Sequence, residues 1–176
     1  MFLIESENNF IMKEIGFHFV EKNNLFTLNK EDLYFEKIYI FYNENLIKVK
    51  FPNKSEKFSL PLSFNQFFKK IILILTDYSF DAGEFRYMPI NQLLVKDNLE
   101  LKLGNIHNLI LSKLLLFRDV GISKETLYKH VWNTDKSINI NKLDTHLTNL
   151  KNLLLSNIKL KLNISSSNGL ISLISN

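Results

Sequence analysis

The chain has 176 residues, enough for one sizeable domain or two small ones, and 45% of them are hydrophobic, which is ample for a packed core. It contains no cysteine, which excludes disulfides, thiolate metal sites and a cysteine nucleophile. The formal net charge of +4 lies entirely in the second half, because residues 1–80 balance ten lysines with ten acids. This modest surplus suits a polyanionic partner without identifying one.

The apolar segments and the histidines argue against a secreted protein, a membrane protein and a metalloprotein. The apolar run at residues 1–4 is short and is followed by Glu5 and Glu7, the wrong charge for a signal peptide. The most apolar window elsewhere, residues 71–75, is far below the ~20 residues that cross a bilayer. The four histidines have no metal-ligand spacing: His18, His107, His130 and His146. We therefore expect a cytoplasmic protein without membrane contact, metal or cofactor.

The first half, residues 1–78, is predicted to be a small α/β domain. Short apolar runs predict strands at residues 2–4, 25–28, 37–42 and 46–51. A helix is expected over residues 9–21. A second helix follows Pro61, where apolar residues recur at helical spacing: Phe64, Phe67, Phe68, Ile71, Ile72 and Leu75. The polar stretch around Asp81-Ala82-Gly83 predicts a short linker between residues 78 and 84.

The second half, residues 84–176, is predicted to be an α+β domain. Small antiparallel strands are expected at residues 85–89, 93–95 and 99–101, and helices at residues 104–117, 123–132 and 141–155. Ser123 should cap the second helix, and Gly121 can supply a left-handed residue after the first. The third helix has one apolar stripe that must face the core: Leu143, Leu147, Leu150 and Leu154. Strands at residues 160–164 and 170–174 form a closing hairpin.

Strands, three helices and a hairpin follow one another in a winged helix-turn-helix. In that fold a polar helix face fits the major groove of B-DNA, and the hairpin reaches the DNA backbone or minor groove. The third predicted helix has such a face, because rotation by about 100° per residue groups Lys142, Thr145, His146 and Asn149. The sequence therefore predicts an α/β domain followed by a winged helix-turn-helix that binds DNA.

Particular residues resemble the effector domain of OmpR/PhoB-type response regulators. The similarity lies in Ile122-Ser123-Lys124-Glu125-Thr126-Leu127, in His130-Val131-Trp132, and in Leu143-Asp144-Thr145-His146-Leu147 followed by Leu150-Lys151. It implies a sequence-specific, DNA-binding transcriptional regulator. Its DNA contacts would fall on Lys142, Thr145, His146, Asn149 and Lys151 in the helix, and on Ser166 and Asn168 in the hairpin. The resemblance also implies that the loop at residues 133–139 contacts RNA polymerase.

The departures from this family leave an alternative open. Gly104 stands in place of a threonine cap, His107 in place of a glutamate, and Asn149 in place of an arginine commonly used on DNA. The hairpin turn is Ser165-Ser166-Ser167-Asn168-Gly169, without the family's arginine. Two charge-assisted DNA contacts are thus missing. The alternative is a protein-interaction module that retains the winged-helix fold but has lost DNA binding.

The first half resembles a degenerate, shortened receiver domain. Phe2-Leu3-Ile4-Glu5 is similar to a receiver's first strand, and Leu60-Pro61-Leu62-Ser63-Phe64 to its last strand-to-helix junction. The phosphorylation chemistry is absent, because Ser6 follows Glu5, Asn43 ends the third strand, and Leu60 replaces the lysine. We therefore expect no aspartyl phosphorylation and no catalytic residues, so the protein should not be an enzyme. The first half should instead mediate homodimerisation or another partner contact.

Overall fold

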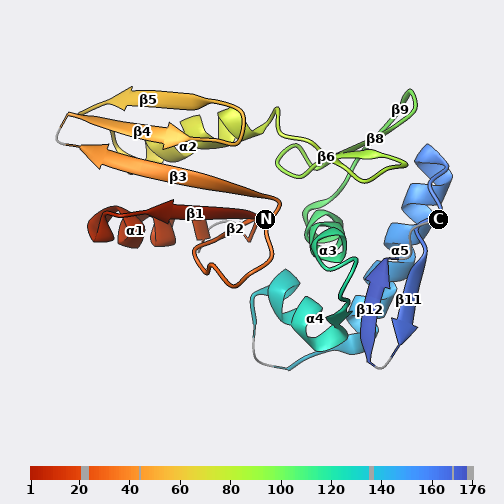
Figure 1. Cartoon of the computed structure of the whole chain (residues 1–176). Helices are drawn as coiled ribbons and strands as arrows, with labels where there is room; N and C mark the ends of the chain where they lie inside the picture. Colours follow the sequence, from red (N-terminus) through yellow and green to blue (C-terminus); the bar gives the residue numbers. More distant parts are fainter. Residues whose placement is uncertain (21–23, 44, 135–136, 168, 174–176) are drawn as a thin grey trace. The chain divides into compact units, whose positions relative to one another are not determined.

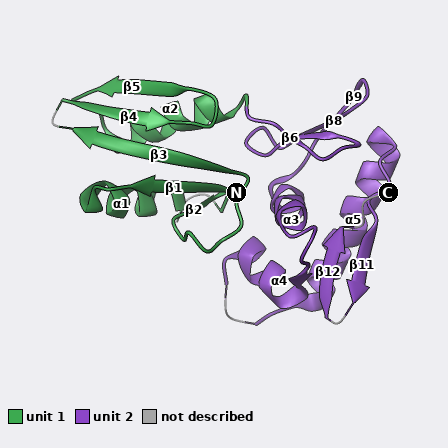
Figure 2. Cartoon of the chain, viewed as in Figure 1, with its two compact units in different colours: residues 1–77 green, residues 78–176 purple. Residues whose placement is uncertain are grey.

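The computed structural model describes residues 1–20, 24–43, 45–134, 137–167 and 169–173. The chain divides into two compact units, Met1–Asp77 and Tyr78–Asn176, which Figure 2 shows in different colours. Both units combine helices with sheets, so the chain is a mixed α/β protein. In the described part of the chain, no helix has the length and apolarity needed to cross a membrane.

Unit 1 contains one five-stranded sheet in the order β2-β1-β3-β4-β5. Its strands are β1 (Phe2–Ser6), β2 (Phe26–Thr27), β3 (Glu36–Asn43), β4 (Leu46–Lys50) and β5 (Ser55–Ser59) (Figure 1). β1 runs parallel to both β2 and β3, whereas β3, β4 and β5 form an antiparallel meander. The order 2-1-3-4-5 is that of flavodoxin-like folds. A true fold of that kind is parallel throughout, so unit 1 shares only its strand order.

Helical segments cover one face of this sheet. The segment predicted at residues 9–21 is α1 (Asn9–Ile15), followed by a π-helical turn, η1 (Gly16–Val20); residue 21 lies outside the described part. α2 (Phe64–Leu75) begins with a capping box formed by Ser63 and Gln66. Phe67 of α2 packs edge-on against Phe58 of β5 and against Phe19 of η1. β5 could not be predicted from its sequence, because its residues are mostly polar.

Unit 2 begins with a four-stranded antiparallel sheet in the order β6-β7-β8-β9. Its strands are β6 (Phe80–Asp81), β7 (Arg86–Met88), β8 (Leu93–Lys96) and β9 (Leu99–Lys102), and each pairs with the next along the chain. We predicted β7, β8 and β9 from their apolar runs. β6 falls in the stretch expected to be a linker, so part of that stretch belongs to this sheet.

Three helices and a second sheet complete unit 2. The helices are α3 (Asn105–Leu116), α4 (Lys124–Trp132) and α5 (Ile140–Ile158), and each contacts the other two. A hairpin closes the chain as predicted, with strands β11 (Ile164–Ser167) and β12 (Leu170–Leu173), but the prediction of a strand at residues 160–164 was wrong. β11 consists mostly of the serines expected to form the turn, because Ser165, Ser166 and Ser167 pair with β12. A short strand missed from sequence, β10 (Ile122–Ser123), pairs with β12 and gives the order β10-β12-β11.

α3 lies at the centre of unit 2, and a buried polar network fastens it to the first sheet. The Tyr87 hydroxyl on β7 lies 2.6 Å from Asn108 Oδ1 and 2.6 Å from Ser112 Oγ, both on α3. The Asn108 amide donates to the Pro89 carbonyl at 3.0 Å. All three polar side chains are fully buried, and these bonds satisfy them. The network therefore holds the platform on which α5 packs.

Candidate nucleic-acid interface

Local capping defines the turn between α4 and α5. Ser123 caps α4 as predicted, and its hydroxyl accepts from the Thr126 amide at 3.0 Å. α4 ends at Trp132, and Asn133 after it has left-handed backbone angles. Asn139 caps α5 and accepts from the Lys142 amide at 3.0 Å. Residues 135 and 136 of the loop assigned to RNA polymerase lie outside the described part, so the loop as a whole stays a prediction.

The apolar stripe of α5 is buried as predicted: Leu143, Leu147, Leu150 and Leu154 are each at most 7% exposed. At about 100° per residue, the side of the helix opposite this stripe carries a ridge of exposed residues. The ridge consists of Asn141, Thr145, Thr148 and Asn152. Only Thr145 was among our predicted contacts. The leucine stripe itself was the signal that could have found the others, because the outermost residues of a packed helix lie half a turn from its buried ones.

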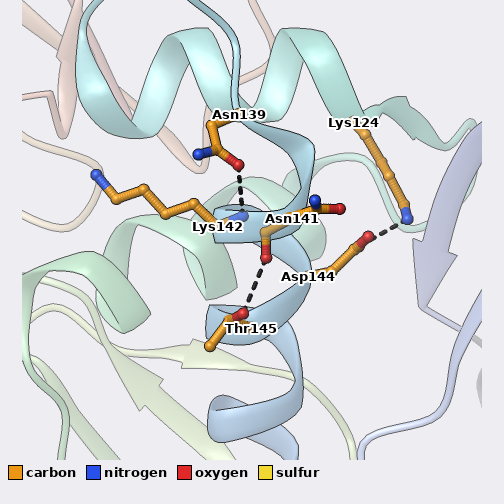
Figure 3. Close-up of polar contacts among 6 residues, drawn as sticks. All are labelled: Lys124, Asn139, Asn141, Lys142, Asp144 and Thr145. Carbon is orange, nitrogen blue, oxygen red and sulfur yellow. Dashed lines mark hydrogen bonds and ion pairs between the residues drawn. The ribbon is translucent and has the colours of Figure 1, made fainter.

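Lys142 lies on one flank of this ridge and is exposed. Figure 3 shows its side chain extending away from Asp144, while Thr145 donates a hydrogen bond to the Asn141 carbonyl at 2.9 Å. The Lys142 ammonium lies 4.5 Å from the centre of the Trp132 ring, a cation–π distance. This contact orients the ammonium group without neutralising its charge.

Asp144 is paired with Lys124 of α4, with 2.6 Å between Oδ1 and Nζ. Asp144 does not cap α5, because Asn139 caps the helix five positions earlier. The ion pair joins α4 to α5 and cancels the only acidic charge of residues 140–173, which also contain four lysines: Lys142, Lys151, Lys159 and Lys161. The described surface of α5 and the hairpin is therefore basic.

His146 is only half-exposed, unlike the other residues predicted on its face. Its ring lies 5.6 Å from that of His107 on α3 and 5.5 Å from that of Trp132 on α4. Its Nδ1 is buried without a hydrogen-bond partner among the described residues. Burial, and secondarily the charge of His146, lower the pKa of His107. His146 lies about 60° from the leucine stripe, so neighbouring helices enclose it.

Asn149 is exposed on the same flank as Lys142, as predicted. Lys151 is not on that flank. Nine residues separate it from Lys142, which at about 100° per residue places the two lysines on opposite sides of α5. Lys151 instead lines a groove of about 360 Å³ between α5 and residues 161–164, together with Asn152 and Lys161. Lys161 was not predicted as a contact, because its segment was expected to be a strand of the hairpin, whereas residues 159–163 are irregular in the structure.

The hairpin offers hydroxyl groups. Ser166 is exposed on β11, and neighbouring Ser165 lies 3.0 Å from Ser172 of β12 between their hydroxyl oxygens. Asn168, the other predicted contact of the hairpin, lies outside the described residues. The arrangement as a whole is an outward ridge of amides and hydroxyls on α5, with a lysine on one side and two on the other.

Comparison with known protein families finds no matching family, and no curated protein matches the chain. Among solved structures, the chain is similar to the C-terminal domain of the nisin resistance regulator NsrR, a lantibiotic response regulator. The identity is 29% and the TM-score 0.44, over 53% of this chain and 93% of that domain. It is also similar to a member of a redox-sensor family in the streptococci that evolved from two-component response regulators. There the identity is 13% and the TM-score 0.46, over 99% of this chain and 67% of that one. At these TM-scores neither similarity assigns a partner or an activity to this chain.

Proposed function

We propose that unit 2 is a winged helix-turn-helix and that the protein is a non-enzymatic, DNA-binding transcriptional regulator. The observation that carries this proposal is the solvent side of α5. A ridge of side chains able to hydrogen-bond base edges, Thr145 among them, lies between Lys142 on one flank and Lys151 with Lys161 on the other. A helix seated in the major groove has a phosphate backbone on each side, which is where the lysines stand.

The role we propose for each residue follows from its position on or beside α5. Lys142, Lys151 and Lys161 contact phosphates and supply affinity that depends on salt. Asn141, Asn149 and Asn152 read bases, since an amide can pair bidentately with adenine. Thr145 and Thr148 contact either base edges or thymine methyl groups. His146 supports the packing of α5 against α3 and α4 and does not take part in readout.

Unit 1 fits a shortened receiver-like domain that is not controlled by aspartyl phosphorylation. Its β2-β1-β3 strands keep the order and direction of a doubly wound sheet, and α1 follows β1. At the carboxyl end of β1, Glu5 is held by ion pairs of 3.3 Å with both Lys30 and Lys37. Although burial opposes ionisation of Glu5, hydrogen bonds from these two ammonium groups lower its pKa. A carboxylate occupied in this way is not available to a metal ion.

The first test is fluorescence anisotropy of the full chain with an AT-rich duplex at several salt concentrations. Lys142→Ala should weaken binding to all sequences and reduce the slope of log affinity against log salt by about 0.9, the value for one phosphate contact. The charge-matched control is Arg86→Ala, which removes an exposed cation on β7. Equal slopes for both variants and the unchanged protein would refute the assigned interface.

Readout is tested separately with Asn149→Ala. We expect it to reduce discrimination between a selected site and a random duplex while leaving the salt slope unchanged. A fall in slope would instead make Asn149 a positioning contact.

A protein partner is the second candidate, and Leu155 favours it. This residue of α5 is 52% exposed and lines the groove beside Lys151 and Lys161. A basic groove with an exposed leucine can bind an acidic, amphipathic segment of a partner protein as well as DNA. If no duplex binds at low salt, this candidate replaces the first.

A further inference from the structure

The sheet of unit 1 has one buried and one exposed face over β3, β4 and β5. The buried face carries apolar side chains at most 7% exposed: Ile38, Ile40, Ile47, Val49 and Phe58. Because side chains alternate along a strand, the intervening residues point to the other face. These are half-exposed Lys37, Tyr39 and Leu46 and exposed Phe41, Asn43, Lys48, Lys50, Ser55, Lys57 and Ser59. We call this set the open face of the sheet.

The open face presents two aromatic rings on its central strand. Tyr39 and Phe41 are two residues apart on β3, with ring centres 6.3 Å apart and planes inclined by only 23°. Phe41 is 45% exposed although it belongs to a sheet with an adequate core beneath it. Two nearly parallel rings side by side on a flat sheet form a surface on which planar groups can stack.

Lysines lie beside these rings in register. Phe41 pairs with Lys48 across β3 and β4, Lys48 pairs with Lys57 across β4 and β5, and Tyr39 pairs with Lys50. Like charges directly opposite one another destabilise a sheet, so the Lys48–Lys57 pair opposes folding. Among the described residues these three lysines form no ion pair. Their charges are therefore available to an anionic partner, which would also relieve the repulsion.

We propose that the open face of unit 1 binds single-stranded nucleic acid. The bases stack on Tyr39 and Phe41, and the phosphates follow Lys48, Lys50 and Lys57 over β4 and β5. The planar bases of a nucleic acid match the two aromatic rings, and its phosphates match the three lysines. An acidic peptide would match only the lysines. A duplex does not fit, because its bases are already stacked on one another and the sheet offers no element that could enter a groove.

A hollow of about 210 Å³ lies on the other side of the rings, and Glu5, Glu7 and Lys30 line it besides Tyr39 and Phe41. The two lysines on this side, Lys30 and Lys37, are already engaged by Glu5. The lysines over β4 and β5 form no ion pair with the described residues, so we place the phosphates of the single-stranded nucleic acid there. The ammonium of Lys37 lies 5.1 Å from the Tyr39 ring centre and is engaged by Glu5, which anchors that ring.

The test measures binding of a fluorescein-labelled oligothymidylate of about 15 nucleotides to the full chain by anisotropy. Phe41→Ala should weaken binding about tenfold, since a base loses its stacking partner. The matched control is Tyr42→Ala: Tyr42 is the next residue on β3, has the same 45% exposure and points to the opposite face. Thermal unfolding of both variants verifies that they fold.

A second pair of variants tests the phosphate path. Lys48→Ala should lower the slope of log affinity against log salt by about 0.7, the value for one contact to a single strand. Lys69→Ala is its control, because Lys69 is an exposed lysine on α2 away from the open face. Lys142→Ala, which alters unit 2, should leave binding of the single strand unchanged. The outcome is therefore independent of whether unit 2 binds duplex DNA.

Three outcomes would overturn the proposal. The first is absence of binding to the single strand at low salt. The second is equal weakening by Phe41→Ala and Tyr42→Ala, which would mean that stacking on the open face is not responsible. The third is loss of binding with Lys142→Ala but not with Phe41→Ala, which would place the single strand on unit 2. If a polyglutamate peptide bound while the oligonucleotide did not, the open face would be a site for an acidic protein segment.

Discussion

Replacing Tyr87 by phenylalanine removes one hydroxyl group from the interior of unit 2 and keeps the ring. That hydroxyl is 2.6 Å from Asn108 Oδ1, and burial raises the pKa of Tyr87, so the group keeps its proton and donates it. The Ser112 hydroxyl retains another acceptor, the Asn108 carbonyl at 2.8 Å. The substitution therefore leaves one buried acceptor, Asn108 Oδ1, without its donor. Such a group costs about 1–3 kcal/mol.

Urea unfolding followed by fluorescence isolates this effect, because Trp132 is the only tryptophan and belongs to unit 2. The transition of Tyr87→Phe should move to lower urea with an unchanged slope. Tyr128→Phe is the control: Tyr128 is also buried, at 6% exposure, but its hydroxyl forms no hydrogen bond with the described residues. We expect Tyr128→Phe to lower the free energy of unfolding by less than about 0.5 kcal/mol. Equal losses in the two variants would refute the assignment of the Tyr87 network.

Two further predictions concern a glycine and a histidine of unit 2. Gly121 has φ of +75°, and a Cβ there would lie 3.1 Å from Leu170 Cβ, so Gly121→Ala should lower the free energy of unfolding by more than about 1 kcal/mol. Gly83 also has a positive φ, +86°, but a Cβ there would meet no neighbouring atom. Gly83→Ala should therefore lose less unfolding free energy in the same urea assay. A larger loss for Gly83→Ala than for Gly121→Ala would contradict the crowding at Leu170. Burial, and secondarily the charge of Lys113, lower the pKa of His130 to about 3 from its usual 6.5. The folded state therefore binds fewer protons than the unfolded chain below pH 6.5, so stability is fully present above that pH and declines as the pH falls toward 3. His130→Gln should flatten this decline in the unfolding midpoint, and an unchanged pH profile would show that His130 is not its source.

Local patterns were enough to predict most helices of this protein. The leucines of α5 recur with the helical period, so their burial could be predicted from residues 143–154 alone. The Ser123 cap and the start of α4 could also be predicted, because a capping side chain bonds an amide three residues away. Of the hairpin, only β12 could be predicted from an apolar run, because β11 consists mostly of serines. All these features depend on residues close together in the sequence.

Contacts between distant segments could not be obtained in this way. β5 is polar and became a strand through pairing with β4, which extends the two strands predicted before it into an antiparallel meander. His146 belongs by helical position near the predicted DNA face, yet His107 and Trp132, from two other helices, half-bury it. Lys161 joined Lys151 at one groove only because the chain folds back after α5. The periodicity of one segment determines which of its sides is apolar, whereas strand partners and the covering of a flank depend on how segments far apart in the chain pack together.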